Sequence, residues 1–316
     1  SIGYWGDHQI VYLLKLLEHS AAFHPGKLQA MLGQQAFTYA DVPYRIASHA
    51  ELCRDPHNTI TFDQDHENTV AQRVDTVGAD GKLVHDADGQ LVRVSLAEKL
   101  LVPALSKLSN LVVDGGIWMN TQRPEWNDAN NALVGHGISM VTLCYLRRYA
   151  AFMIDLLGDA EAESVTLSSA VNDWLDGVAG VLTKHAGLLD AATVSDVDRR
   201  GVLDGLGLSF EAYRNRVADQ GLGQPVERSA DDVATMFTTA LNYLDHAIDA
   251  NRRDEDGLYH SYNLLTLDGE VGADNATARV GTLYPMLEGQ VAVLSTGRLD
   301  AATSASLIDS LYASDL

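Results

Sequence analysis

The side chains best suited to chemistry lie in the segment RPEWNDANNALVGHG, residues 123–137. Its acidic, amide and indole side chains belong to Glu125, Trp126, Asn127, Asp128 and Asn131. An indole stacks on the C–H face of a sugar ring, while carboxylates and amides bind its hydroxyls. A carboxyl group beside an indole tends to have a raised pKa, which suits a general acid near neutral pH. The segment therefore indicates sugar chemistry. The alternative is that Asp128 or Asn131 caps the next helix while Trp126 fills the core.

Trp118 lies in the same long connection between expected helices, residues 113–132. Two further connections of this kind are expected, at 35–68 and 252–281. Connections this long are uncommon inside a compact helical domain unless they have a function. All three carry Asp, Glu, His, Trp or Tyr, so the functional residues are expected to lie in them.

The N-terminal segment GYWGDHQIVYLLKL has the same chemical character. Asp7 is well placed to cap a helix over residues 7–23. Trp5 could stack on a sugar ring, and His8 could donate a hydrogen bond to a hydroxyl. A capped helix with an aromatic staple is the alternative interpretation.

A third group of candidates lies in DEDGLYHSYNLL, residues 254–265, and in the helix that follows. Tyr259 and His260 could line a polar pocket. Glu288 lies in an otherwise apolar segment, where an unpaired carboxylate would be costly, so it is a candidate catalytic base. Exposure of Glu288 on the surface is the simpler explanation.

No metal ion and no cofactor are predicted. The segment HNTITFDQDHENT, residues 57–69, is rich in His, Asp and Glu, but its spacing matches no zinc or calcium-loop pattern. The patterns G-x-S-x-G, C-x-x-C, G-x-x-x-x-G-K-[ST] and G-x-G-x-x-G do not occur, which argues against serine hydrolases, thiol oxidoreductases, NTPases and Rossmann enzymes.

Helical periodicity dominates the elements that must position these residues. Eight or nine helices are expected, at about 7–23, 95–112, 133–158, 164–189, 193–220, 230–251, 282–296 and 300–313. Strand patterns are few, and the clearest predicts a β-hairpin insertion at about 69–95.

Composition limits the partners and the compartment. The chain of 316 residues carries 43 acidic and 22 basic side chains, a net charge of −21, which argues against nucleic-acid and anionic-membrane partners. No apolar stretch reaches the length of about 20 residues that a membrane span needs. Cys53 and Cys144 are predicted to be free thiols in a reducing, cytoplasmic compartment. No oligomeric state is predicted.

Two motifs point to a family. PEWNDANNALVGHGISM resembles the DWND-x-x-N-x-x-G-x-x-x-x-S segment of the cellobiose and chitobiose phosphorylases, and YWGDHQIVYLL is similar to their tryptophan/serine-Asp-Asp-x-x-W-L segment. The resemblance implies an (α/α)6 toroid, with the active site in the loops at one end, that cleaves β-glucosidic bonds with inversion. It also implies that Asp128 protonates the glycosidic oxygen, that Asp7 holds sugar hydroxyls and that Trp126 forms a wall of that subsite.

The sequence departs from the family pattern in two respects. Glu125 replaces the family's first aspartate, and no phosphate-binding residues are found near the C-terminus. Water is therefore the expected nucleophile, and inorganic phosphate is the alternative. An inverting hydrolase needs a second carboxylate roughly 6.5–9.5 Å from the acid. The candidate bases are, in order, Glu288, Asp256 and Asp63.

Residues 1–316 are expected to form a single helical toroid domain that is incomplete, as a fragment of a longer chain. The expected partner is an oligosaccharide or glycoside substrate. A non-catalytic, glycan-binding helical toroid is the first alternative. A sugar isomerase or epimerase that uses paired imidazoles from His8, His136 and His260 is the second.

Overall fold

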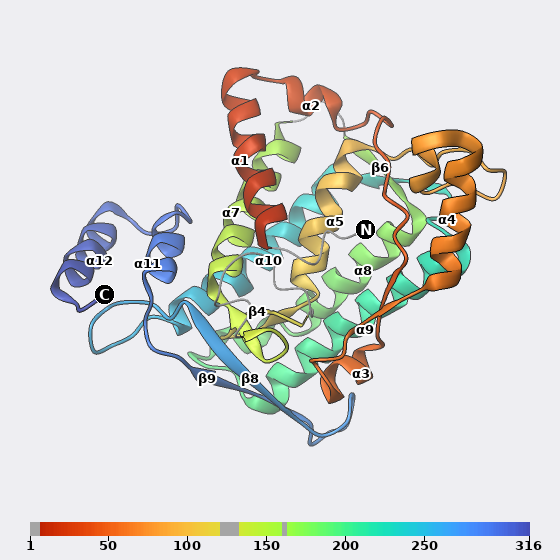
Figure 1. Cartoon of the computed structure of the whole chain (residues 1–316). Coiled ribbons are helices and arrows are strands. Elements are labelled where there is room, and N and C mark those ends of the chain that lie inside the picture. Colours follow the sequence, from red (N-terminus) through yellow and green to blue (C-terminus); the bar gives the residue numbers. More distant parts are fainter. Residues whose placement is uncertain (1–6, 121–132, 160–162) are drawn as a thin grey trace.

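The computed structural model describes residues 7–120, 133–159 and 163–316. This part of the chain is 57% helix and 15% strand, so the expected mainly helical class is confirmed (Figure 1). Its 11 α-helices are α1 (Asp7–Phe23), α2 (Lys27–Met31), α3 (His49–Arg54), α4 (Gln64–Val77), α5 (Leu96–Leu108), α7 (Met140–Gly158), α8 (Ser169–Lys184), α9 (Asp196–Gln220), α10 (Ala230–Ala250), α11 (Leu287–Leu294) and α12 (Ala301–Ala313).

Several of these helices begin at capping side chains that the sequence makes recognisable. The hydroxyls of Ser95, Ser139 and Ser195 accept hydrogen bonds from backbone N–H groups in the first turns of α5, α7 and α9. Helix α9 ends at Gly221, whose positive φ of 73° favours glycine. These capping interactions explain why most expected helix boundaries lie close to the observed ones.

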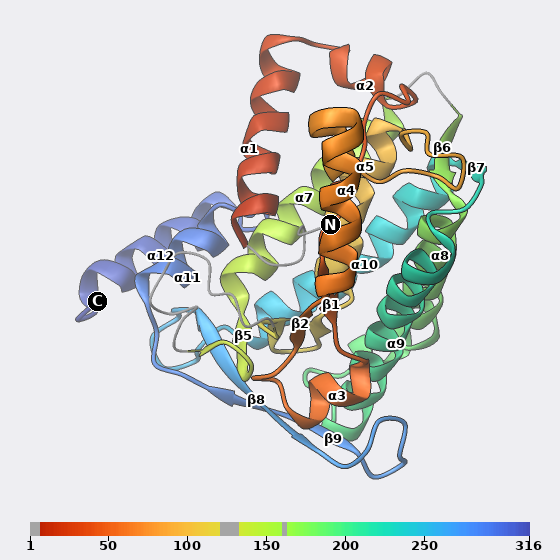
Figure 2. The same ribbon diagram turned by 45° about the vertical axis from the view of Figure 1, so that its right-hand side comes forward.

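Helix α7 is the centre of the helical packing, with α1, α5, α10 and α11 against it (Figures 1 and 2). Lys15 of α1 lies over the ring of Tyr145, with Nζ 5.7 Å from the centroid. One turn further along both helices, Glu18 pairs with Arg148. Both pairs join residues 130 positions apart, so α1 and α7 run parallel and in register.

The strands form one larger sheet and two small ones. The larger sheet is antiparallel throughout and curls into a half-barrel, with the strand order β3 (Leu111–Val112), β4 (Gly116–Trp118), β5 (Gly137–Ser139), β8 (Tyr262–Asp268) and β9 (Thr277–Thr282). The two-stranded sheets pair β1 (Tyr44–Ile46) with β2 (Ile60–Phe62), and β6 (Ser164–Ser168) with β7 (Pro225–Ser229). Segments expected to be connections, such as 252–281, therefore contain strands.

The β-hairpin expected at 69–95 is wrong for its first half, because α4 and a 3₁₀ turn at Gly78–Lys82 occupy residues 64–82. Val70, Val74 and Val77 recur at four- and three-residue spacing, which is helical, and Asp63 caps the helix by accepting from the His66 N–H. Only the segment after residue 82 is hairpin-like, with an isolated antiparallel bridge between residues 85 and 91.

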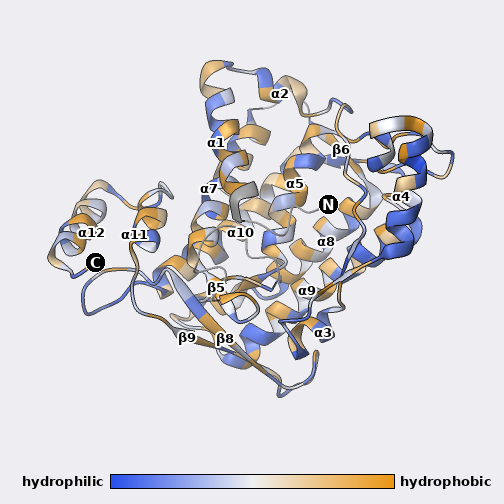
Figure 3. Cartoon of the chain, in the orientation of Figure 1, coloured by the Kyte–Doolittle hydropathy of each residue, from blue (hydrophilic) through white to orange (hydrophobic). Residues whose placement is uncertain are grey.

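The main hydrophobic core fills the space between α1, α5, α7, α8, α9 and α10. A second cluster lies between the sheet and α9, with Leu52, Ile138 and Leu203 among its members. Figure 3 shows the long helices banded by hydrophobic and hydrophilic residues, as expected for helices with one buried face. None of the described helices combines the length and the apolarity that crossing a bilayer requires.

Candidate functional site

The residues predicted to form the sugar site differ in how far the structure describes them. Asp7 and His8 are the first two residues of α1. Those outside the described residues are Trp5, Glu125, Trp126, Asn127, Asp128 and Asn131. Those with described side chains are Trp118, Tyr259, His260 and Glu288. The position of the site therefore follows from the elements that carry these residues.

The segment that contains Asp128 leaves from β4 and returns to β5 on the same sheet. The Met119 N–H donates to the carbonyl of Gly137 at 2.9 Å, which joins the two ends of the segment. Asn120 donates from Nδ2 to Oδ1 of Asn110 at 2.6 Å, and both side chains are buried. Asn120 and Gly137, which lie on either side of residues 121–132 in the chain, are thus both held at the sheet.

The register of α1 against α7 brings the N-terminal motif to the same place. With the offset of 130 positions, Asp7 lies level with residues 137–140, where β5 passes into α7. The views in Figures 1 and 2 agree that α1 and α7 begin toward the end of the molecule that carries the sheet. The start of α1 and the start of α7 therefore lie at the same end of the helical packing.

Ser261 joins the start of α7 to the start of α11. Its carbonyl accepts from the Met140 N–H at 3.0 Å, and its hydroxyl accepts from the Gly289 N–H at 2.8 Å and donates to the carbonyl of Met286 at 3.0 Å. Glu288, beside Gly289, is exposed in the first turn of α11. The first turns of α1, α7 and α11 thus lie at one end of the helical packing.

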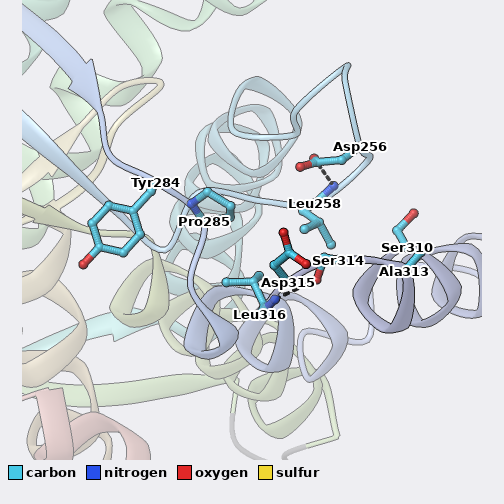
Figure 4. Close-up of a pocket in the computed structure, with 9 residues that line it drawn as sticks. All are labelled: Asp256, Leu258, Tyr284, Pro285, Ser310, Ala313, Ser314, Asp315 and Leu316. Carbon is cyan, nitrogen blue, oxygen red and sulfur yellow. Dashed lines mark hydrogen bonds between the residues drawn. The ribbon is translucent and has the colours of Figure 1, made fainter.

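Asp256, the second candidate base, lies close to Arg253. Arg253 Nε donates to Oδ1 at 3.0 Å, and the Leu258 N–H donates to the same oxygen at 3.0 Å. Burial opposes ionisation, but these hydrogen bonds outweigh it and lower the pKa of Asp256. Figure 4 shows Asp256 in a shallow pocket with Tyr284, Pro285 and the end of α12. Asp256 is therefore ionised, as a base must be, but it is bound to an arginine.

Trp118 and Tyr259 lie in the core instead of lining an open polar pocket. Trp118 is 3% exposed, and its indole N–H donates to the carbonyl of Gly135 at 2.9 Å. Tyr259 is 2% exposed, and its backbone N–H and carbonyl both bind the side chain of Gln290. Neither ring has an exposed face on which a sugar could stack.

The two described candidate histidines have defined surroundings. His260 is half-buried, with Nδ1 2.7 Å from the carbonyl of Leu283, so Nδ1 donates to that carbonyl and Nε2 is the other ring nitrogen. His136 faces His57, with ring centroids 5.6 Å apart. A Cβ on Gly135 would lie 2.8 Å from Nδ1 of His57, so the glycine permits this approach. His57 was not among the expected pairing histidines, because it is 79 positions from His136 in the sequence.

One group in the described part of the chain has the spacing of metal ligands: His49, Cys53 and Asp204, with their ligand atoms within 4.8 Å of one another. Nε2 of His49 lies 2.8 Å from Oδ1 of Asp204 and 3.5 Å from Sγ of Cys53. Because one nitrogen faces both groups, it cannot link them as a relay does. Arg200 donates to the same Asp204 oxygen at 2.8 Å, and burial raises the pKa of Cys53 to about 12. The group therefore joins α3 to α9 and is unsuited to nucleophilic chemistry.

Comparison with known proteins adds no family to this picture. No protein-family model matches the sequence, and no curated protein matches it significantly. The functional argument therefore depends on the motifs and on the elements that bring them together.

Proposed function

We propose that this protein is a carbohydrate-active enzyme that cleaves β-glucosidic bonds with inversion, with Asp128 as the general acid. The observation that carries the proposal is the parallel register of α1 and α7. It brings Asp7 level with the start of α7, which follows the segment that contains Asp128 in the chain, although Asp7 and Asp128 lie more than a hundred residues apart in the sequence. Convergence of distant motifs at one end of a helical packing is what an active site requires.

The roles follow the chemistry of the residues. Asp7 holds sugar hydroxyls, Trp126 stacks on the ring, and Asp128 donates a proton to the leaving oxygen. Glu288 is the proposed base, because α11 begins against the first turn of α7 and the side chain is exposed to water. Inversion would require roughly 6.5–9.5 Å between the Asp128 and Glu288 carboxyl groups, which leaves room for the attacking water.

The helix directions support the finer proposal of an incomplete (α/α)6 toroid. Helices α1 and α7 run away from the sheet. Ser261 joins the start of α7 to the first turn of α11, and Arg148 in the middle of α7 donates to Ser295 at the end of α11, so α11 runs parallel to them. Helices α5 and α10 pack against α7 and run toward the sheet, because β3 follows α5 and Asn251 at the end of α10 binds Asn263 of β8. Parallel inner helices with antiparallel outer ones are the arrangement of two concentric rings.

Two alternative functions would use the same site. A non-catalytic glycan-binding protein would use the aromatic and amide groups without activating water. A sugar isomerase or epimerase is favoured by one observation, the facing imidazoles of His57 and His136.

The test is a panel of β-linked gluco-oligosaccharides, incubated with the protein with and without inorganic phosphate, with products and anomers followed by NMR. We expect an α-anomeric sugar from hydrolysis. Asp128→Asn should lower kcat by about 10²–10⁴-fold, because general acid catalysis supplies that factor. Asp190→Asn, on an exposed residue, is the matched control. Full turnover of an unactivated oligosaccharide by Asp128→Asn would refute the assignment.

The same experiment separates the alternatives. Sugar 1-phosphate formed only with phosphate indicates a phosphorylase. Binding without any turnover indicates a glycan-binding protein. Interconversion of free sugars that is lost in His136→Gln indicates the isomerase.

A further inference from the structure

A cavity of about 410 Å³ lies on the other side of the helical packing, between α9 and the segment that leads through β1 to α4. Helices α5 and α8 form its floor. We call it the α4–α9 cavity. No residue of α1, α7 or α11 lines it, so it is separate from the proposed sugar site. Its volume lies within the range of small-molecule sites, roughly 300–1,000 Å³.

One wall of the α4–α9 cavity is aromatic and rigid. The Trp174 indole is stacked on Tyr213, with centroids 4.3 Å apart, and on Phe210 at 4.9 Å. The Trp174 N–H is bound to the hydroxyl of Ser109, so the wall presents no unpaired indole donor. Tyr213 is half-buried and lines the cavity. Trp174 and Phe210 are buried, so a flat or alicyclic ring would stack on Tyr213, which they support.

The opposite wall is rich in cations. Arg45 and Arg73 line this wall with His66 and His85, Arg214 lines the cavity from α9, and Asp41 is the one carboxylate among the lining residues. An excess of basic over acidic side chains around a cavity is unusual in a chain with a net charge of −21.

The one lining carboxylate is already engaged. Asp41 is paired with Arg73 and with Nε2 of His66, the latter at 2.6 Å. Arg45 binds Asp63 only through Nε, at 3.2 Å, and among the described residues nothing engages its two Nη groups. Terminal guanidinium groups bind carboxylates and phosphates well.

A buried hydroxyl at the floor also lacks a partner. Ser106 is 2% exposed, and its Oγ has no hydrogen-bond partner among the described residues. It lines the α4–α9 cavity from α5. Buried hydroxyls are nearly always satisfied, but this oxygen exposes less than 1 Å² and lies beneath the cavity surface, so a ligand does not reach it.

We propose that the α4–α9 cavity binds a small organic anion, with its ring against the aromatic wall and its carboxylate or phosphate toward Arg45 and Arg73. The volume admits one ring with an acidic group. This site does not depend on the proposed glycosidase activity.

The test is calorimetric titration of the protein with matched anionic and neutral probes. Benzoate and phenyl phosphate represent aryl anions, glucuronate and glucose 6-phosphate represent sugar anions, and benzyl alcohol and glucose are the neutral counterparts. We expect at least one anion to bind ten-fold or more tightly than its neutral counterpart, and the two anion series to distinguish an aryl ligand from a sugar ligand. Inorganic phosphate alone should bind more weakly than either phosphate ester.

Two variants locate the binding. Arg45→Met and Arg73→Met should each weaken binding of the preferred anion by five-fold or more, with melting curves verifying that the variants fold. Arg54→Met, whose side chain is 78% exposed on α3, is the matched control and should bind as the parent does. Asp128→Asn should also leave this binding unchanged. Equal affinity for neutral and anionic probes, no measurable binding of any anion, or unchanged binding in both cavity variants would overturn the proposal.

Discussion

Arg148 of α7 holds both carboxylate oxygens of Glu18 on α1, from Nε to Oε1 at 2.6 Å and from Nη2 to Oε2 at 2.8 Å. Its third nitrogen, Nη1, donates to the carbonyl of Ser295 at the end of α11 at 3.2 Å. One guanidinium therefore connects three parallel helices and sets the level at which their first turns lie.

Replacing Arg148 should lower the free energy of unfolding by more than replacing an ordinary surface arginine does. Arg148→Met should lower the free energy of unfolding by about 2 kcal/mol, because hydrogen bonds to charged groups contribute about 1.5–3 kcal/mol and this pair is about one-third exposed. Glu18→Gln should cost about 1 kcal/mol. Urea denaturation at neutral pH measures both. Arg54→Met is the control, and an equal cost there would contradict the connecting role of Arg148.

Asp204 should be essential for stability. It lies between His49 and Arg200, and the Arg200 side chain is 1% exposed. Asp204→Ala leaves this arginine buried without its carboxylate, so we expect a loss of about 3–5 kcal/mol in the free energy of unfolding. Asp198→Ala on the exposed face of α9 should cost about 1 kcal/mol, through its contact with the cap residue Ser195. A cost for Asp204→Ala no larger than this would contradict the buried pair.

The same aspartate should contribute to acid denaturation. Burial raises the pKa of Asp204, but hydrogen bonds from His49 and Arg200 outweigh it, and the pKa lies below the ordinary 3.8. A carboxyl group with a lowered folded-state pKa stabilises the fold above its unfolded pKa, and that stability is lost as the pH falls through the folded value. Stability should therefore fall below about pH 4. Asp204→Asn should lose this component of the pH dependence, which denaturation at a series of acidic pH values measures.

Glu98 should make the pH dependence of stability opposite to that of Asp204. Burial raises its pKa above 4.5, although hydrogen bonds from the Ser168 N–H and the Tyr39 hydroxyl oppose the rise. The contribution of such a group is fully present below the unfolded pKa and is lost as the pH rises through the folded pKa. Glu98→Gln removes this loss, so the melting temperature of the variant relative to the parent should increase between about pH 4 and pH 7. A constant difference across this range would show that the Glu98 pKa is not raised.

Both cysteines should be unreactive in the folded protein. Burial raises the pKa of Cys53 to about 12 and raises that of Cys144 as well. An ordinary thiol has a pKa of about 8.5, so the thiolate of Cys53 near pH 8 should be rarer by more than a thousand-fold. A disulfide reagent should label neither thiol in the native state and two per chain in urea. Rapid labelling of one thiol in the native protein would show that α3 does not stay packed on α9.

Trp118 should stabilise the sheet without contacting a ligand. Trp118→Phe removes the indole N–H that binds the carbonyl of Gly135, so we expect a loss of about 1–3 kcal/mol in the free energy of unfolding. Affinity for gluco-oligosaccharides should stay within two-fold of the parent. Tyr284→Phe, at a residue that is 70% exposed, is the control for stability. Unchanged stability with lost glycan affinity would restore the original prediction that Trp118 binds sugar.

Local signals account for what was predicted well. The helix expected over 7–23 coincides with α1, and the one expected over 300–313 differs from α12 by one residue. The free state of Cys53 and Cys144 was also predicted correctly. Periodicity and caps act within one or two turns, so a single sequence contains the information.

The sheet and α4 could not be predicted from local signals in the sequence. Strand β5 has three residues, and it pairs with β8, which begins 123 positions after Ser139. A segment so short carries no alternation of its own. In α4, the valines at 70, 74 and 77 have helical spacing. The residues around them also fit the alternation of a strand, so only the packed structure distinguishes the two patterns.

The sequence alone therefore determined the helical class, most helix boundaries, the thiol state and the residue types suited to sugar chemistry, because each depends on neighbours along the chain. The tertiary structure decided which of these residues meet: Glu18 with Arg148, Asp41 with Arg73, and His57 with His136. Such pairs depend on the burial of helix faces that are remote in sequence, and that free energy has no local signature in the chain.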